Sequence, residues 1–418
     1  MTSPSFAIRR LPSALALALA TAASALAQTT HQVGPGGFAQ IGDAVAAAQP
    51  GDLIVVQQGL YQPFDVSIGV RIVAPAGATV SPAIGAQFPV SITVPSGQRA
   101  SFVGLSWRTV TAYPPAIWPL TMQVQGHAVF QNCSFQCSNA DFEGTPTTCN
   151  GDVQFDRCIW TALDDCLEVT GGHVQLNDCN LTASSTNYNQ GPAHAVVATG
   201  GVLEIFSSSL RGAGGASSNS CPGSSAVVLS GNARLRITDS AAIAGTSWFL
   251  SCSPGVAAIE NNTGNPVLHA RSTLTGSQGQ IGFPPVLVQA PPIAGPEQQE
   301  PLVGGIGPGS GPASGFAYSA TVFGPLNAFV AVGLSFDRAP ATTIPFFTTP
   351  VHFDPGTVIA YQWGLLTTPL AAWPGFGSFD TQTPPLPAAG LGLELWLHPI
   401  TWDGAELRAG PTLGGVLR

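Results

Sequence analysis

Residues 153–160 read Val-Gln-Phe-Asp-Arg-Cys-Ile-Trp, and this stretch decides the fold. A large apolar residue, Phe155, is followed three positions later by Cys158 and two further on by another apolar residue, Trp160. The phrase occurs six times between residues 129 and 274, at intervals of 21 to 32 residues, with Cys or Ser in the middle position. A period of this length is typical of stacked supersecondary units. The other copies are Phe130-Cys133-Phe135, Leu176-Cys179-Leu181, Ile205-Ser208-Leu210, Ile237-Ser240-Ala242 and, more weakly, His269-Ser272-Leu274.

Within each copy, apolar residues alternate with polar ones, as in Val153-Gln154-Phe155 and Val174-Gln175-Leu176. This two-residue period indicates strands with one buried face. Gly, Asn and Ser clusters bound the strands, and helical spacing is absent between them. We therefore predict an all-β chain built around a right-handed parallel β-helix, a solenoid in which equivalent residues of successive turns lie about 4.8 Å apart.

Residues 33–56 suggest how the solenoid begins. Ile41, Val45 and Ala48 have helical spacing, which predicts a capping helix over the open end of the first turn. The order Gly-Pro-Gly-Gly, an Ala-rich helix, Pro-Gly-Asp and a Val/Ile strand resembles the start of secreted pectin-lyase-like proteins. That resemblance covers roughly residues 33–280 and implies the right-handed β-helix fold.

The two ends of the chain differ from the repeats. Residues 1–27 have two arginines, a Leu/Ala run and an Ala-Leu-Ala sequence before Gln28, which is the pattern of a secretory signal peptide. We expect a secreted or cell-surface protein without a transmembrane segment in the mature chain. Residues 28–282 are assigned to the solenoid, 283–315 to a Pro/Gly-rich linker, and 316–418 to a small β-sandwich-like domain.

Composition restricts the partners. Charged residues make up 8% of the chain, Lys is absent, and 22 acidic residues outnumber 13 basic ones, so nucleic acid is not an expected partner. A polar surface with little charge suits a neutral extracellular polysaccharide or a cell-envelope component. In the C-terminal domain, four tryptophans are either sugar-stacking faces or core residues, two readings that the sequence leaves open: Trp363, Trp373, Trp396 and Trp402.

The eight cysteines allow disulfides in an exported protein. Those in the repeated phrase share their position with serines of later turns, which favours a stack of small inward side chains. Cys221 and Cys252 follow their own phrases by 13 and 12 residues, so they are candidates to link neighbouring loops. Cys137 and Cys149 are candidates to close a loop in the same way.

Eight of the 22 acidic residues fall between Asp141 and Asp178. Aligning the Gly-Gly turns of two neighbouring repeats places Asp165 beside His194, and a carboxylate next to an imidazole can share a proton. No His or Cys spacing fits a metal, and no cofactor is predicted, although the acidic cluster would suit Ca²⁺.

These residues resemble the polygalacturonase-like glycoside hydrolases. Asp164-Asp165-Cys166-Leu167 is similar to their Asp-Asp-Cys-Ile element, and the sequence around His194 to their Gly-Pro-Gly-His-Gly-Ile element, with alanines beside the histidine. The resemblance implies that Asp165 or Asp164 is a general acid and that another carboxylate, here Glu143, activates water. Arg234-Leu235-Arg236 echoes the family's substrate-binding Arg-Ile-Lys. Arg157 is a third candidate for substrate binding. A lyase mechanism is a second enzymatic option, with Arg157 as its base.

Each of these residues also has a structural interpretation. Aspartates in β-helix turns commonly accept hydrogen bonds from turn N–H groups, and His194 suits a stacked ladder. We therefore predict a secreted β-helix protein that binds or modifies extracellular polysaccharide, and leave open whether it is an enzyme. The alternative is a non-catalytic structural or adhesive surface scaffold.

Overall fold

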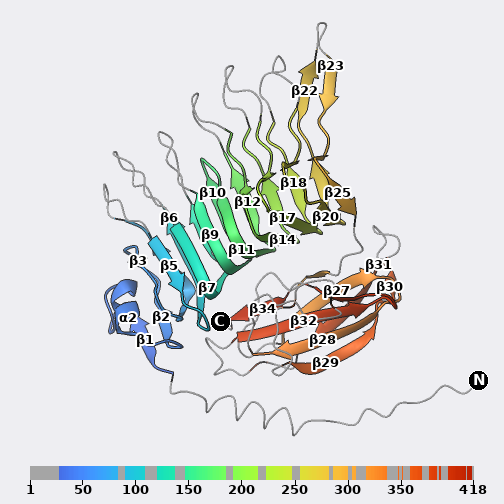
Figure 1. Ribbon diagram of the computed structural model, residues 1–418. Coiled ribbons are helices and arrows are strands. Elements are labelled where there is room, and N and C mark those ends of the chain that lie inside the picture. The colour runs from blue at the N-terminus through green and yellow to red at the C-terminus, as the bar shows by residue number, and fades with distance from the viewer. Residues whose placement is uncertain are drawn as a thin grey trace, which may run out of the picture.

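The fold was described from a computed structural model of the chain (Figure 1). The structure describes residues 28–82, 90–108, 120–136, 146–184, 192–214, 223–246, 255–281, 286–299, 304–306, 317–336, 347, 351, 358–369, 376–383, 386, 394–410 and 412–416. Within these ranges strands are the predominant secondary structure, and the one helix, α2 (Ile41–Ala47), buries Ile41, Ala44 and Val45 in the same core as the first turns. The described part contains no helix long and apolar enough to cross a membrane.

As the sequence predicts, parallel strands stack into a β-helix; the solenoid has three sides. Side 1 consists of β5 (Val90–Val94), the first parts of β7 (Leu120–Gln131), β9 (Thr147–Asp156) and β11 (Leu167–Asn177), and β13 (Val196–Ala198), β16 (Val227–Leu229), β19 (Ile259–Asn261) and β24 (Ile293–Ala294). Side 3 consists of β3 (Leu60–Tyr61), the second parts of β4 (Arg71–Val80) and β6 (Arg99–Arg108), and β8 (Ser134–Gln136), β10 (Ile159–Ala162), β12 (Asn180–Ala183), β15 (Ser209–Arg211), β18 (Ala241–Ile243) and β21 (Thr273–Thr275).

Side 2 lies between them and runs from the first turn to the last. It consists of β1 (Thr30–Val33), β2 (Leu53–Val56), the first parts of β4 (Arg71–Val80) and β6 (Arg99–Arg108), the second parts of β7 (Leu120–Gln131), β9 (Thr147–Asp156) and β11 (Leu167–Asn177), and β14 (Val202–Phe206), β17 (Arg234–Thr238), β20 (Val267–Ala270) and β25 (Glu297–Gln299).

The apolar residues of the repeated phrase form two stacks inside the solenoid. On side 2, the ring of Phe130 lies between those of Phe102 and Phe155, with centroids 4.6 and 5.0 Å away. On side 3, the ring of Phe135 lies between those of Trp107 and Trp160, at 5.0 and 4.5 Å. Stacking of like side chains in successive turns explains why the phrase repeats.

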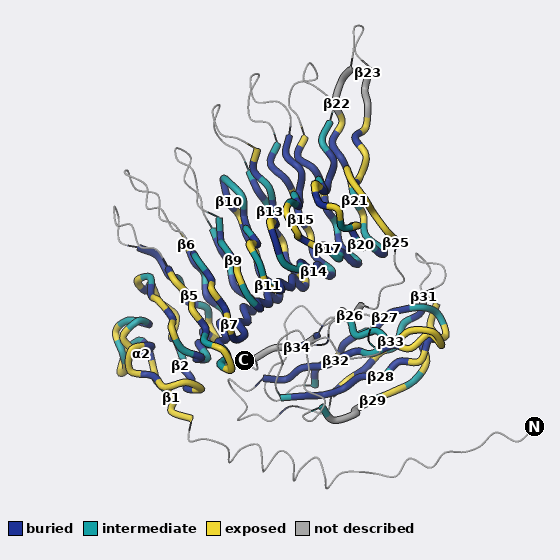
Figure 2. The backbone as a smooth tube through the Cα atoms, in the orientation of Figure 1, coloured by how far each residue is buried: buried dark blue, intermediate teal, exposed yellow. Residues whose placement is uncertain are grey.

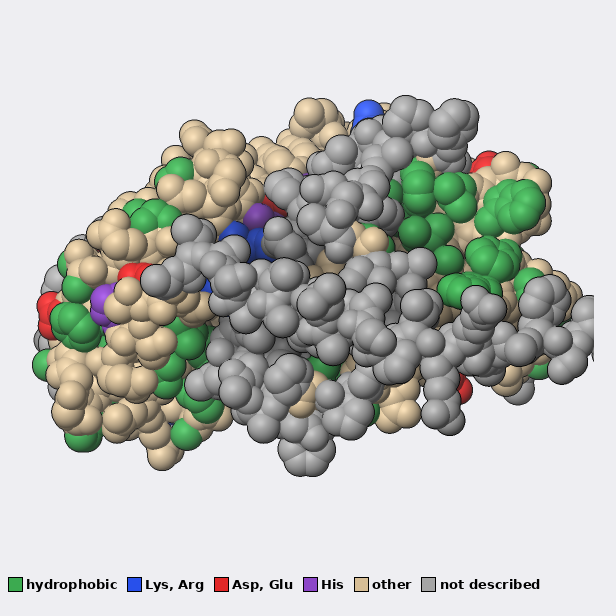
Figure 3. Space-filling model, turned by 90° about the horizontal axis from the view of Figure 1, so that it is seen from below, with side chains coloured by type: hydrophobic (Ala, Val, Ile, Leu, Met, Phe, Trp, Pro, Cys, Tyr) green, Lys and Arg blue, Asp and Glu red, His purple; other side chains and the backbone are tan. Residues whose placement is uncertain are grey.

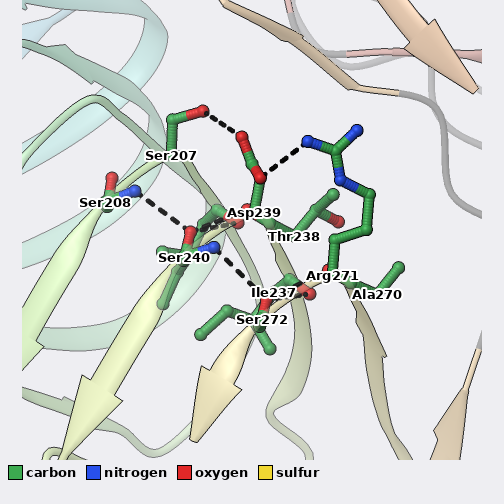
Figure 4. Close-up of polar contacts among 10 residues, drawn as sticks. Ser207, Ser208, Ile237, Thr238, Asp239, Ser240, Ala270, Arg271 and Ser272 are labelled. Atoms are coloured by element: carbon green, nitrogen blue, oxygen red, sulfur yellow. Dashed lines mark hydrogen bonds and ion pairs between the residues drawn. The ribbon is translucent and has the colours of Figure 1, made fainter. Parts of the chain in front are cut away.

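The Cys/Ser position of the phrase forms the bend between sides 2 and 3. The residue before it has a positive φ in all six copies, for example 52° at Arg157 and 53° at Arg271, which turns the chain sharply. The following Cys or Ser side chain points inward and donates to two carbonyls: Ser240 Oγ lies 2.7 Å from Thr238 O and 3.5 Å from Ile205 O. Figure 4 shows that the Oγ atoms of Ser240 and Ser272 also accept the backbone N–H groups of Ser208 and Ser240, respectively, in the previous turn.

The cysteines follow the same geometry. Cys133, Cys158 and Cys179 are buried free thiols in this ladder, so the predicted stack of small inward side chains is confirmed. Cys149 is also a buried free thiol, with its Sγ 3.7 Å from Met122 Sδ. The expected loop closure between Cys137 and Cys149 was therefore wrong, because Cys149 lies on β9 and points into the core. Cys137, Cys221 and Cys252 lie outside the described residues.

The solenoid extends into the stretch expected to be a linker. β24 and β25 pair with β19 and β20, so the last turn reaches Gln299. The prolines occupy its corners, where the carbonyls of Pro292 and Pro296 accept the N–H groups of Ile259 and Val267 at 3.1 and 3.0 Å. The proline-rich composition of this stretch therefore corresponds to the turns between the strands of the last solenoid turn. A hairpin of β22 (Gln278–Ile281) and β23 (Val286–Gln289) projects from this turn.

The C-terminal domain consists of two antiparallel sheets that share one hydrophobic core. One sheet has the order β26 (Gly304–Ile306), β27 (Ser319–Pro325), β31 (Phe376–Gln382) and β30 (Thr368–Pro369). The other has the order β29 (Ile359–Leu365), β28 (Phe329–Ser335), β32 (Glu394–Trp402) and β33 (Leu407–Ala409), with β34 (Leu413–Val416) also beside β32. The domain lies along side 2 of the solenoid (Figure 1), and side 2 is buried next to it (Figure 2).

Candidate functional site

The predicted catalytic aspartates lie at the corner between sides 3 and 1, just before β11. Asp164 Oδ1 accepts the backbone N–H of Asp165 at 2.8 Å, which is a local turn bond. Asp165 Oδ1 accepts the backbone N–H of His194 in the next turn at 2.6 Å. The alignment of the two repeats therefore placed Asp165 and His194 correctly beside each other. The contact, however, is with the backbone of His194 and not with its ring.

The ring of His194 is held by the following turn. Its Nδ1 lies 2.8 Å from the carbonyl oxygen of Ser225. A carbonyl oxygen only accepts, so Nδ1 carries the proton and Nε2 is the acceptor nitrogen of the neutral ring. Asp165 and His194 are both half-buried, which leaves part of each side chain open to solvent.

The electrostatics at this corner resemble those of a general acid. Burial raises the pKa of Asp165, and the negative charges of Asp164 and Glu168 raise it further, whereas the hydrogen bond from His194 opposes the shift. Glu168 begins the outward row of side 1 and accepts a hydrogen bond from Thr148 Oγ1 at 3.2 Å. A carboxyl group with a raised pKa beside a second carboxylate is the arrangement used for acid–base chemistry. Glu143, the predicted base, lies outside the described residues.

Of the three arginines predicted to bind substrate, Arg234 and Arg236 lie on side 2 and Arg157 lies at the bend between sides 2 and 3, away from the corner that holds the aspartates. Arg236 Nη1 forms an ion pair with Glu204 Oε1 at 2.8 Å, and Arg234 is exposed at the start of β17. Arg157 is a bend residue whose Nε donates to Asn132 Oδ1 at 3.3 Å. The sequence therefore grouped residues that the fold places on different sides of the solenoid.

Side 2 carries a buried chain of charged groups that the sequence reading did not single out. His127 Nδ1 lies 3.1 Å from Asp152 Oδ2, and His173 Nε2 lies 3.1 Å from Glu204 Oε2, which also pairs with Arg236. The sequence did contain a signal for these charged groups, because polar residues alternate with the inward apolar ones in these strands. Burial opposes the charged form of His173, but hydrogen bonds and charges from Asp152 and Glu204 raise its pKa to about 9.

The C-terminal domain covers this row of charged groups on side 2 and contacts side 2 through polar side chains. Glu394 pairs with Arg99 at 2.8 Å and accepts a hydrogen bond from Ser101 Oγ at 3.0 Å. Burial alone would raise its pKa, but the charge and hydrogen bond of Arg99 lower the pKa to about 2. At the other end of side 2, the guanidinium of Arg271 lies 3.8 Å from the centre of the Phe323 ring.

The sheet that carries Glu394 has an exposed aromatic patch at its far end. Phe329 pairs with Leu365 on one side and with Trp402 on the other, and Trp363 lies two pairs further along. These four side chains, which we call the aromatic patch, are 40, 50, 51 and 66% exposed, respectively. Figure 3 shows hydrophobic side chains gathered on this part of the C-terminal domain. Trp396 is fully buried and is therefore a core residue, whereas Trp363 and Trp402 are exposed; Trp373 lies outside the described residues.

Among the described residues, no three His, Cys, Asp or Glu side chains gather in a way that would hold a metal ion. The comparisons with known proteins gave no relative: no protein-family model matches the chain, and no curated protein matches it.

Proposed function

We propose that this chain is an exported, non-catalytic polysaccharide-binding protein, in which a rigid β-helix carries a C-terminal domain that binds glycan through the aromatic patch. The observation that carries the proposal is the exposure of Trp363, Trp402 and Phe329 on neighbouring strands. Soluble proteins rarely leave several large apolar side chains together in water, and such patches mark interaction sites.

The patch suits a neutral glycan better than a charged ligand. Neighbouring strands lie about 4.8 Å apart, so the rings of adjacent strands form a continuous apolar surface. Ala331 pairs with Trp363 and leaves room beside that indole. The flat C–H face of a pyranose ring packs against such indole and phenyl rings, while its hydroxyls remain in water. The predicted signal peptide and the low charge of the chain are consistent with this partner.

Replacing Trp363 and Trp402 together with alanine is expected to weaken polysaccharide binding at least about tenfold, since anchor aromatics carry much of the energy of an interface. Residues 28–418 and the variant would be compared on soluble and insoluble neutral polysaccharides by affinity electrophoresis and sedimentation. Leu60→Ala is the control, because Leu60 is 65% exposed on the solenoid, outside the patch. No binding by the parent chain, or equal binding by the double variant, would reject the proposal.

A second candidate function is glycoside hydrolysis at Asp165. The observation that favours it is the raised pKa of Asp165 beside Glu168, together with the fixed orientation of His194. Its first requirement is that Asp165 supplies a proton to the leaving oxygen, as a general acid in an inverting or retaining mechanism does.

If the chain is a hydrolase, Asp165→Asn will reduce sugar release by about 100-fold or more, because the amide cannot donate that proton. Reducing-end release from neutral and acidic polysaccharides measures this directly. Asp380→Asn is the matched control, since Asp380 is exposed on the C-terminal domain, where its Oδ1 accepts a hydrogen bond from Thr321 Oγ1 at 2.7 Å. Absence of release from every substrate, with both variants folded, leaves the binding function alone.

A further inference from the structure

A cavity of about 340 Å³ lies between the first turns of the solenoid and the C-terminal domain. Its charged and aromatic lining comes from both parts: Arg71 and Arg99 from side 2, Phe336 and Glu394 from the C-terminal domain. In Figure 3, which looks at this side of the molecule, basic side chains lie sunk between the solenoid and the C-terminal domain. A volume of this size is at the lower end of the range for small-molecule sites and fits one sugar-sized ligand.

The short turns of the solenoid leave this space open. Gly51 and Gly97 line the cavity with φ values of 95° and 75°, in the left-handed region that favours glycine. A Cβ on either residue would meet no atom within 4 Å, so the backbone is not packed against other groups there. Because glycine has no side chain, nothing projects from these two positions into the cavity, and the peptide groups there remain accessible to a ligand.

Arg99 and Ser101 already hold a carboxylate, and that carboxylate belongs to the other domain. The Glu394 carboxylate accepts hydrogen bonds from Arg99 Nη1 at 2.8 Å and from Ser101 Oγ at 3.0 Å. From its own strand it accepts a third, from Trp396 Nε1 at 2.8 Å. The two solenoid donors therefore form an oxyanion site. Glu394 occupies this oxyanion site. It belongs to the C-terminal domain, which is joined to the solenoid by a long connection.

Arg71 adds a second guanidinium to the same cavity. Its Nη2 donates to Gln28 Oε1 at 3.0 Å and to Gly51 O at 3.4 Å. A guanidinium has five N–H donors in a planar fork that matches the geometry of a carboxylate, so Arg71 brings to the cavity the side-chain chemistry that recognises oxyanions. Burial lowers the pKa of Arg71; the charge of Glu394 opposes this shift, and the charge of Arg99 adds to it.

We propose that this cavity binds a small organic carboxylate of the size of one sugar acid, with Arg71 and Arg99 on the carboxylate and Phe336 against its carbon skeleton. The ligand competes with Glu394 for Arg99. Its binding therefore opposes the contact that holds the C-terminal domain on side 2 at this end. The cavity is separate from the aromatic patch and from Asp165, so the inference does not rest on the proposed function.

Isothermal titration of residues 28–418 with sodium glucuronate tests the site, with glucose as the neutral probe and sodium sulfate as the simple anion. We expect binding of glucuronate without measurable binding of glucose. Arg71→Gln should weaken glucuronate binding at least about tenfold, whereas Glu394→Gln should strengthen it severalfold, because the competing charge is gone. Arg408→Gln is the matched control: Arg408 pairs with Asp403 on the C-terminal domain and should leave affinity unchanged.

Arg71 is the residue to change because removing Arg99 would leave the Glu394 carboxylate buried without its main partner. If Arg71→Gln does not fold, Arg71→Lys keeps the charge but not the fork, and a severalfold loss of affinity is expected. Equal affinity of the parent chain and the folded Arg71 variant overturns the proposal. So does equal binding of glucose and glucuronate. Sulfate binding as tightly as glucuronate would mean an adventitious ion only.

Discussion

Replacing Phe130 with alanine is expected to lower the free energy of unfolding by about 3–5 kcal/mol, the range for removing a buried Phe side chain. Phe130 is fully buried and stacks between Phe102 and Phe155. It also contacts the second stack edge-on, with its ring centroid 5.9 Å from that of Phe135. The truncation therefore removes contacts with three turns at once, and the stacked backbone cannot close the resulting cavity without changing its register.

Urea denaturation of the mature chain measures this loss. Phe130→Leu is the control, because it keeps most of the volume and should cost less than about 1.5 kcal/mol. If Phe130→Ala costs under about 1 kcal/mol, the aromatic stack is not the element that holds neighbouring turns together, and the Cys/Ser ladder would then be the main determinant.

Raising the pH from 6.5 to above 9 is expected to remove about 3 kcal/mol of stability through His173. The folded-state pKa of His173 is about 9, against an ordinary value of 6.5. A group whose pKa is raised by folding stabilises fully below its unfolded pKa, and this contribution is lost as the pH rises through the folded pKa. Asp152 and Glu204 face the ring from both sides, and Arg236 and His127 continue the chain.

The opposite arm of the profile comes from the carboxylates. Glu204 and Glu394 have folded pKa values of about 2 against ordinary values of 4.5, so their contribution is present above pH 4.5 and is lost as the pH falls toward 2. Chemical denaturation between pH 3 and pH 10 should therefore show greatest stability between about 4.5 and 6.5. His173→Gln should flatten the alkaline arm; an alkaline arm that is equally steep in the variant would contradict the assignment to His173.

The candidate site was only partly predictable. Aligning two repeats placed Asp165 beside His194, because equivalent residues of a solenoid stack in register. It did not show that Asp165 accepts the backbone N–H of His194, which depends on how the corner turns. Arg157 was grouped with the aspartates because it is close to them in sequence, and Arg236 because Arg234-Leu235-Arg236 resembles the family's Arg-Ile-Lys element. The fold places Arg157 at the bend between sides 2 and 3 and Arg236 on side 2.

The sequence by itself determined the solenoid: the spacing of Phe155, Cys158 and Trp160 and its five other copies encode the strand, the bend and the inward stack of each turn. These are local patterns whose partners lie one period away, so the chain carries their register in its own repeat. Only the tertiary structure decided that side 2 is covered, that Trp396 is buried while Trp363 and Trp402 are exposed, and that Glu394 meets Arg99. Those outcomes depend on how two independently patterned parts of the chain pack together, and no local period records the contact between residues nearly 300 positions apart.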